Sequence, residues 1–187
     1  MPVLRHARPR PHAARGRAAG CIRADRGSDR TLTRFLVLAV GNPAREDDGI
    51  GPRLAEALER LALPDVFVQA GYQFDPEDAF LVAQNPVVVF VDAAAEGPAP
   101  FFLRRLEPAR NTGFSTHALT PEIVLGLARD CFGWQGEGWV LGIRGCSFEP
   151  FVERLTPEAE AHLEAARAFL EAALREGVLT APSPLPE

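Results

Sequence analysis

Two uninterrupted apolar runs constrain the fold of this chain more than any other feature. The first, FLVLAV at residues 35–40, ends in the turn residues Gly-Asn-Pro, and the second, VVVFV at residues 87–91, ends directly at Asp92. Strands without polar residues on either face are typical of parallel sheets whose two faces are both covered by helices. The sequence therefore predicts an α/β protein with a mainly parallel, twisted central sheet.

Strand-like and helix-like segments alternate along the rest of the chain, which is typical of a three-layer αβα fold. Apolar residues recur every three or four positions after Gly49, and Thr156-Pro157 and Gly177 fit the start and the end of a long helix. The predicted strands, about five in number, are 35–40, 65–70, 86–93, 100–108 (edge-like) and 138–143. The predicted helices are 49–61, 75–84, 120–131 and 156–177.

The regular pattern begins only at residue 35, so residues 1–34 are predicted to be a disordered, Arg-rich extension. They hold nine arginines and two acids, whereas the remainder holds eleven arginines and 23 acids. A basic arm for nucleic acid is the other interpretation of this charge, but we expect no nucleic-acid partner. One domain is predicted at residues 35–178, followed by a Pro-rich tail at residues 179–187.

Nothing in the sequence predicts a membrane partner, because no apolar run approaches the roughly 20 residues that cross a bilayer. The N-terminal residues also lack the apolar core of a secretory signal. The three cysteines, at positions 21, 131 and 146, fit neither a disulfide framework nor a C-x-x-C pair. We therefore expect a cytoplasmic protein in which Cys131 and Cys146 are small core residues.

The segment GNPAREDDGIG, residues 41–51, places Glu46, Asp47 and Asp48 side by side where a helix begins. One acid is enough to cap a helix, and adjacent carboxylates repel one another, so the other acids need solvent or a cation. In open α/β sheets, ligands bind beyond the carboxyl ends of the strands, where Asp47, Asp48 and Asp92 are all expected. A turn or N-cap role is the plain alternative for Asp92.

A third segment, STHALT at residues 115–120, places His117 among hydroxyl side chains just before a predicted helix. Two carboxylates and an imidazole from three loops at one sheet edge indicate a divalent-metal site. Mixed nitrogen and oxygen ligands suit zinc or nickel better than magnesium. A dinucleotide site is not indicated, because the chain lacks G-x-G-x-x-G after its first strand and the acids would repel a pyrophosphate.

Four segments carry a resemblance to a known family: FLVLAVGNPAREDDGIGPRLAEAL, VVVFVDA, STHALTPEIVLGLA and VLGIRG. Their order and approximate spacing are similar to those of the [NiFe]-hydrogenase maturation endopeptidases, over residues 35–175. The resemblance implies an endopeptidase that removes a short C-terminal extension from the [NiFe]-hydrogenase large-subunit precursor after nickel has been inserted. A metal-dependent and an aspartic mechanism both fit this resemblance.

The resemblance also implies roles for single residues. Asp48, Asp92 and His117 match the family's metal-contacting residues and form the expected catalytic centre, with Asp47 capping the helix or orienting Asp48. The nickel would arrive with the precursor, so no permanent cofactor is expected. The residues expected to contact the substrate are Asn42, Asp47, Thr116, Gly142 and Arg144.

Two departures from the family motifs concern the expected substrate cleft. Gln69 stands where many relatives have an acid, and GIRG, residues 142–145, stands where others have G-I-Q-P. Two other functions fit the same residues: a non-catalytic nickel-dependent chaperone for the large subunit, or an unrelated hydrolase or nucleotide-binding enzyme of the same fold. Only a protease shortens the precursor, so the mass of the product separates these functions.

Overall fold

The computed structural model describes residues 35–110 and 119–180. All the described residues belong to one compact unit. The extension predicted at residues 1–34, most of the predicted tail, and the predicted site residues Thr116 and His117 lie outside the described residues.

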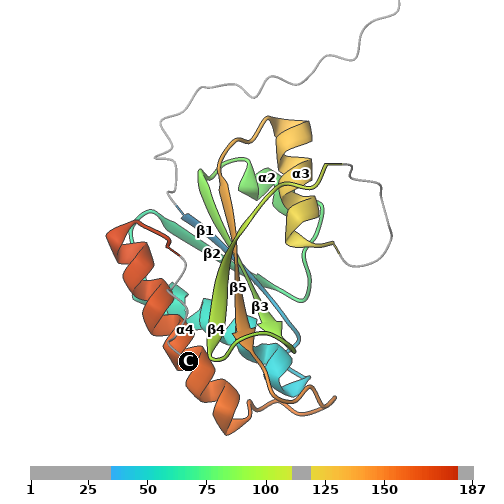
Figure 1. Cartoon of the computed structure of the whole chain (residues 1–187), viewed down its shortest axis with the longest axis vertical. Helices are drawn as coiled ribbons and strands as arrows, with labels where there is room; N and C mark the ends of the chain where they lie inside the picture. Colours follow the sequence, from blue (N-terminus) through green and yellow to red (C-terminus); the bar gives the residue numbers. More distant parts are fainter. Residues whose placement is uncertain (1–34, 111–118, 181–187) are drawn as a thin grey trace, which may run out of the picture. The chain divides into compact units, whose positions relative to one another are not determined.

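The described residues form a five-stranded sheet in the order β2-β1-β3-β5-β4 (Figure 1). Neighbouring strands are parallel except β4, which pairs antiparallel with β5 at one edge. The strands are β1 (Phe35–Val40), β2 (Val66–Gly71), β3 (Val87–Ala94), β4 (Phe101–Leu106) and β5 (Glu137–Arg144). This arrangement confirms the predicted mainly parallel sheet and the edge position of its fourth strand.

Helices cover both faces of the sheet, α1 and α4 on one face and α2 and α3 on the other (Figure 1). They are α1 (Ile50–Leu61), α2 (Asp78–Val82), α3 (Pro121–Phe132) and α4 (Pro157–Glu176), and a 3-10 turn, η1 (Glu46–Gly49), precedes α1. Because both faces are covered, all six residues of β1 are buried, as its apolar sequence predicts.

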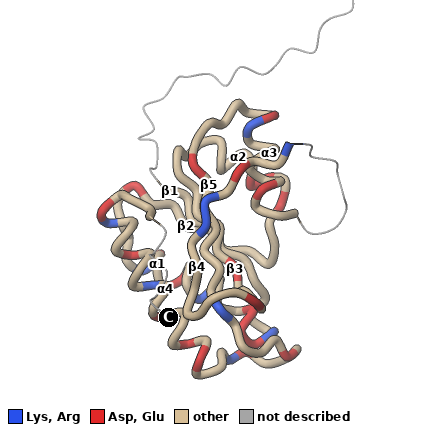
Figure 2. Tube along the Cα trace, in the orientation of Figure 1, with Lys and Arg blue, Asp and Glu red and all other residues tan. Residues whose placement is uncertain are grey.

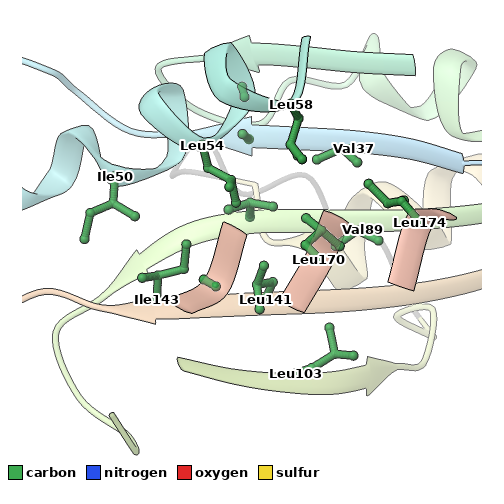
Figure 3. Packing of buried hydrophobic residues seen from close by; sticks show 14 of the residues in the cluster. Val37, Ile50, Leu54, Leu58, Val89, Leu103, Leu141, Ile143, Leu170 and Leu174 are labelled. Atoms are coloured by element: carbon green, nitrogen blue, oxygen red, sulfur yellow. The ribbon is translucent and has the colours of Figure 1, made fainter. Parts of the chain in front are cut away.

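Alternate residues of the central strands enter two separate cores. On one face, β1, β3 and β5 pack against α1 and α4 through side chains that include Val37, Leu54, Leu58, Val89, Leu141, Leu170 and Leu174 (Figure 3). On the other face, β1 and β3 pack against α2 and α3 through side chains that include Leu36, Leu38, Val82, Phe90, Val124 and Leu125. The close packing of both cores fixes the strand ends from which the loops of the candidate site begin.

The helix predicted at residues 75–84 is shorter, Asp78–Val82, because the residues before it form a turn. The Asp75 carbonyl accepts a hydrogen bond from the Asp78 N–H at 3.1 Å. The Asp75 N–H in turn donates to the Asp78 carboxylate at 2.9 Å. Asp78, rather than the predicted Asp75, therefore supplies the side-chain oxygen that holds this turn.

Both described cysteines are exposed and free, which corrects the prediction that they are small core residues. Cys131 lies in the last turn of α3, and Cys146 lies in the loop that follows β5. Apolar character alone did not decide their burial, because both positions lie at element ends where the core no longer covers them.

The longest described helix, α4, has a charged outer face (Figure 2). Arg167 pairs with Glu164 and Glu171, and Arg175 pairs with Glu171. Across residues 35–110 and 119–180, no helix combines the length and the apolar surface that a membrane span requires.

Candidate active site at the ends of β1 and β3

The candidate site lies where the chain changes direction across the sheet. β1 has β2 on one side and β3 on the other, and it runs parallel to both. Connections from adjacent strands diverge at such a point, which leaves a crevice beyond the carboxyl ends of the strands. Asp48, which follows β1, and Asp92, near the end of β3, both belong to this edge of the sheet.

Two glycines allow the loop after β1 to fold back onto the strand end. Gly41 has a φ of +145°, and a Cβ placed on it would lie 1.9 Å from the Asp48 carbonyl oxygen. A Cβ on Gly51 would lie 2.1 Å from the Val40 carbonyl oxygen. Any larger residue at either position would therefore push the acid-bearing loop away from β1.

The first residues of this loop bind the Asp48 side chain near its end. The Asn42 N–H donates to Asp48 Oδ2 at 3.0 Å, and the Asn42 side-chain oxygen accepts from the Ala44 N–H at 3.0 Å. Asn42, a predicted substrate contact, therefore fixes the position of Asp48. Neither Asp47 nor Asp48 makes a side-chain cap for the helical turns that follow them.

Asp48 and Asp92 repel each other. Burial raises the pKa of Asp92, the hydrogen bond from the Ala93 N–H lowers it, and the negative charge of Asp48 raises it, with a resulting pKa of about 6. Within the described part of the chain, neither carboxylate takes part in an ion pair. Two close carboxylates without a balancing charge are suited to hold a cation or to share a proton.

Asp47 faces away from this pair. Its carboxylate is fully buried and accepts hydrogen bonds from the N–H groups of Cys146 and Ser147, at 2.8 and 3.0 Å. It also accepts from the Thr156 N–H at 2.7 Å and from the Thr156 hydroxyl at 2.8 Å. Burial would raise the pKa of Asp47, but the hydrogen bonds from Thr156, Cys146 and Ser147 outweigh it and lower the pKa.

This geometry bears on the expectations for Asp47. Its side chain makes no cap for the helix that follows it, which corrects the predicted capping role, and it is buried in this structure, so its predicted contact with the substrate stays a prediction. It binds the loop after β5 instead, together with Thr156. The Thr156 hydroxyl also accepts from the Ala159 N–H at 3.2 Å, so Asp47 supports the N-cap of α4.

The two predicted substrate residues on β5 lie beside Asp92 but are engaged elsewhere. Gly142 is the register partner of Asp92, and a Cβ on it would lie 2.2 Å from the Phe102 ring. The Arg144 guanidinium donates to the Gly97 carbonyl at 3.2 Å. In this arrangement Gly142 makes room for Phe102, and Arg144 holds the turn that leads into β4.

The structure does not test the full three-residue site, because His117 lies outside the described residues. Among the residues that are described, no three or more His, Cys, Asp or Glu side chains gather as metal ligands. The carboxylates of Asp48 and Asp92 therefore remain two parts of a predicted metal site, and Thr116 and His117 remain sequence predictions.

Sequence reasoning missed one buried acid next to this site. A hollow of about 430 Å³ at the ends of β1 and β2 is lined by Val40, Gln69, Asp75 and Asp78, among others. Gln69 donates to the buried Asp78 at 3.4 Å, and burial raises the pKa of Asp78, as do the charges of Asp75 and Glu77. The signal was present, because Asp78 precedes Val82 by four residues and so shares its buried helix face.

The end of the sheet that holds these residues carries both signs of charge. The loops after β1 and β5 carry basic and acidic residues, which include Arg45, Glu149, Glu153 and Arg154, and both colours appear at that end of the sheet in Figure 2. The candidate site is therefore not distinguished by a net charge of one sign at this end of the sheet. The distinguishing feature is the local pair of Asp48 and Asp92.

Comparison with known proteins shows what this arrangement is similar to. No protein-family model matches the chain. The chain is 35% identical over 151 residues to the hydrogenase 2 maturation protease of Escherichia coli (strain K12), and the match covers 76% of the chain and 92% of that protein.

Solved structures agree with this match. The hydrogenase maturating endopeptidase HybD from E. coli is 31% identical, with a TM-score of 0.58, and the match covers 79% of this chain and 96% of that one. The [NiFe] hydrogenase maturation protease HycI from Thermococcus kodakarensis KOD1 is 26% identical, with a TM-score of 0.59, and the match covers 76% of this chain and 93% of that one.

Proposed function

The chain belongs to the hydrogenase maturation proteases, and from this premise we propose that it cuts the large-subunit precursor of a [NiFe]-hydrogenase and removes its C-terminal extension after nickel insertion. The enzyme is an endopeptidase whose substrate is another protein. We assign it to the cytoplasm, in keeping with its free cysteines, Cys131 and Cys146.

The observation that carries this proposal is the carboxylate pair at the ends of β1 and β3. Asp92 is held partly protonated near neutral pH by burial and by the charge of Asp48, and no described basic residue pairs with either acid. A cation brought by the substrate would relieve this repulsion. We propose that Asp48, Asp92 and His117 contact the nickel of the precursor.

Nickel acts here as part of the substrate, and bound at the site it would supply a positive charge that polarises a carbonyl or a water. Thiolate ligands on the precursor would keep the metal, while the enzyme adds only oxygen and nitrogen contacts. Because the metal is shared between the two proteins in this way, the enzyme would bind a precursor that contains nickel more tightly than one that does not. This sharing also predicts that free nickel binds poorly, with a dissociation constant on the order of micromolar or weaker.

In the metal-free protein Asp92 has a pKa suited to acid–base chemistry, and a nickel ion bound to its carboxylate would lower that pKa. The reaction requires a group that takes a proton from the attacking water and returns one to the leaving amine, and such groups work best with a pKa near the working pH. The pKa of Asp92, about 6, is closer to neutrality than that of an ordinary carboxyl. The neighbouring Asp48 is held in place by the hydrogen bond that the Asn42 N–H donates to its carboxylate at 3.0 Å.

The test is to incubate the purified enzyme with nickel-loaded and nickel-free precursor and to weigh the products. We expect the loaded precursor alone to lose its C-terminal extension, and Asp48→Asn, Asp92→Asn and His117→Ala to abolish the cut while remaining folded. Binding of the loaded precursor without any loss of mass would indicate a chaperone instead. Nanomolar affinity for free nickel, measured by calorimetry, would point to a metalloprotease with its own metal.

A further inference from the structure

The loop that follows β5 is joined to the loop that carries Asp48. Residues 145–156, here called the rim loop, pair with residues 41–49, here called the acidic loop. The Glu46 N–H donates to the Val152 carbonyl at 2.7 Å, and the Val152 N–H donates to the Ala44 carbonyl at 3.3 Å. An isolated parallel bridge joins Arg45 and Val152, and the Asp47 carboxylate binds the rim loop at Cys146, Ser147 and Thr156. The two loops therefore hold each other in one arrangement.

Two phenylalanines of the rim loop have opposite environments. Phe148 is half-buried, and its ring lies against Gly145, where a Cβ would come within 2.7 Å of it. Phe151 is 94% exposed, the highest value among the large apolar side chains of the described residues. Phe151 therefore gains nothing from burial in the isolated protein.

The backbone at Phe151 is also strained. Its φ is +64°, in the left-handed region that bulky L-residues rarely adopt, and Glu46, whose N–H bonds the neighbouring Val152, has a φ of +51°. Glycine would adopt this conformation freely. An exposed aromatic residue on strained backbone that the surroundings hold in place is typical of a functional contact.

The pairing of the two loops limits how far Phe151 can lie from Asp48. Phe151 precedes Val152 by one residue, and Asp48 follows Arg45, the bridge partner of Val152, by three. Four Cα steps of about 3.8 Å and one strand-pair spacing of about 4.8 Å make this path roughly 20 Å long, which is the upper limit of the distance between the two Cα atoms. A folded protein whose chain reaches Asp48 is large enough to contact the rim loop as well.

We propose that Phe151 is an anchor that docks the large-subunit precursor beside the cutting site, an inference that rests on the proposed function. The occupant is the precursor because the substrate is a protein and the rim loop is bonded to the loop that carries Asp48. A rigidly presented phenylalanine loses little freedom on binding and is suited to fill an apolar socket on the partner. Phe151 thus recognises the folded precursor, whereas Asp48 and Asp92 act on the chain to be cut.

The test compares three variants with the wild-type enzyme on nickel-loaded precursor. Phe151→Ala should raise KM at least tenfold and leave kcat within twofold, because docking is lost and the cutting site is intact. Phe151→Leu should restore most of the affinity. The matched control is Val178→Ala, which removes another exposed apolar side chain, 55% exposed, next to Gly177. Gly177 lines a hollow together with Phe35 at the opposite end of β1, so this control should leave KM unchanged.

Thermal unfolding and direct binding make the result decisive. The melting temperature of Phe151→Ala should stay within about 2 °C of the wild type, since no buried contact is lost. A wild-type enzyme that cuts the precursor and a Phe151→Ala variant with unchanged KM would overturn the anchor and leave the proposed function intact. If the wild type leaves the precursor uncut, the proposed function fails. In that case the affinity for the precursor, measured directly, tests the anchor, and equal affinities of the wild type and Phe151→Ala would overturn it. A wild-type dimer that Phe151→Ala dissociates, with KM unchanged, would assign Phe151 to self-association and also overturn the proposal.

Discussion

Asp92 carries an electrostatic cost in the metal-free protein. Its pKa is about 6 in the folded chain and 3.8 as a free side chain, because burial and the charge of Asp48 disfavour the ionised form. Between pH 4 and pH 6 the folded protein keeps a proton that the unfolded chain releases. Stability therefore falls as pH rises through this window, and the full cost, about 1–3 kcal/mol, is present above it.

Asp92→Asn should therefore stabilise the metal-free protein while it abolishes the cut. We expect its melting temperature to exceed that of the wild type by several degrees at pH 8 and to match it at pH 4. Thermal unfolding at both pH values, with a chelator present, measures this. An equal difference at the two pH values would show that repacking, rather than charge, is responsible.

Asp47 should behave in the opposite way. Asp47→Asn removes the charge that receives the Cys146, Ser147 and Thr156 donors, and it directs an amide N–H at one of them. We expect a loss of about 3 kcal/mol in unfolding free energy, measured by urea denaturation. Glu46→Gln is the matched control, because Glu46 accepts only a 3.5 Å bond from Glu149 and should cost less than about 0.5 kcal/mol. A similar loss in both variants would contradict this role for Asp47.

Residue positions next to strong strands were predictable, whereas partners distant in sequence were not. Asp92 was placed correctly near a strand's end because the apolar run before it fixes where that strand lies. The role of Asp47 could not be predicted, since its partners Cys146 and Thr156 are 99 and 109 residues away. Three adjacent acids look alike in a sequence, and only the fold decides which of them turns inward.

At the scale of elements, the packing of α1 against β1 depends on a glycine. Gly51 lies in the first turn of α1 and touches the end of β1 through the Val40 carbonyl. This contact sets the approach of α1 to the sheet and therefore the position of the acidic loop between them.

Gly51→Ala should separate α1 from β1. A Cβ would lie 2.1 Å from backbone, which cannot move like a side chain, so we expect a loss of at least about 3 kcal/mol and no cutting activity. Gly71→Ala is the control, because its Cβ would meet the Gln73 carbonyl at an ordinary 3.4 Å. Urea denaturation of both variants provides the comparison, and a Gly51→Ala protein of wild-type stability would show that the helix adjusts freely.

Strand and helix positions followed from the sequence to within a few residues, but their arrangement in the sheet did not. The long helix predicted from Thr156 to Gly177 is present, because Thr156 at its start and Gly177 at its end are residue types that favour helix caps. The helix at 75–84 was predicted too long, since Asp75 and Pro76 start a turn as readily as a helix. The position of β5 between β3 and β4 depends on side-chain packing across the sheet, which no local pattern records.

At the scale of the whole molecule, the described residues that carry the candidate site all follow the Arg-rich segment at residues 1–30. We expect deletion of this segment to leave both the melting temperature and the cutting rate unchanged, because the sequence there has no apolar pattern to bury against the domain. Calorimetry and the precursor assay test this on the shortened chain. A drop in melting temperature of more than a few degrees would show that this segment supports the fold.

The hydrogen bonds between Asp47 and Thr156 can form only late in the synthesis of the chain. Thr156 follows Asp47 by 109 residues, so at 5–20 residues per second it leaves the ribosome roughly 5–20 seconds later. Until then the Asp47 carboxylate lacks the two hydrogen bonds that Thr156 donates, and the acidic loop is not joined to the residue that begins the last helix. The acidic loop therefore acquires its full set of hydrogen bonds only after most of the domain has been synthesised.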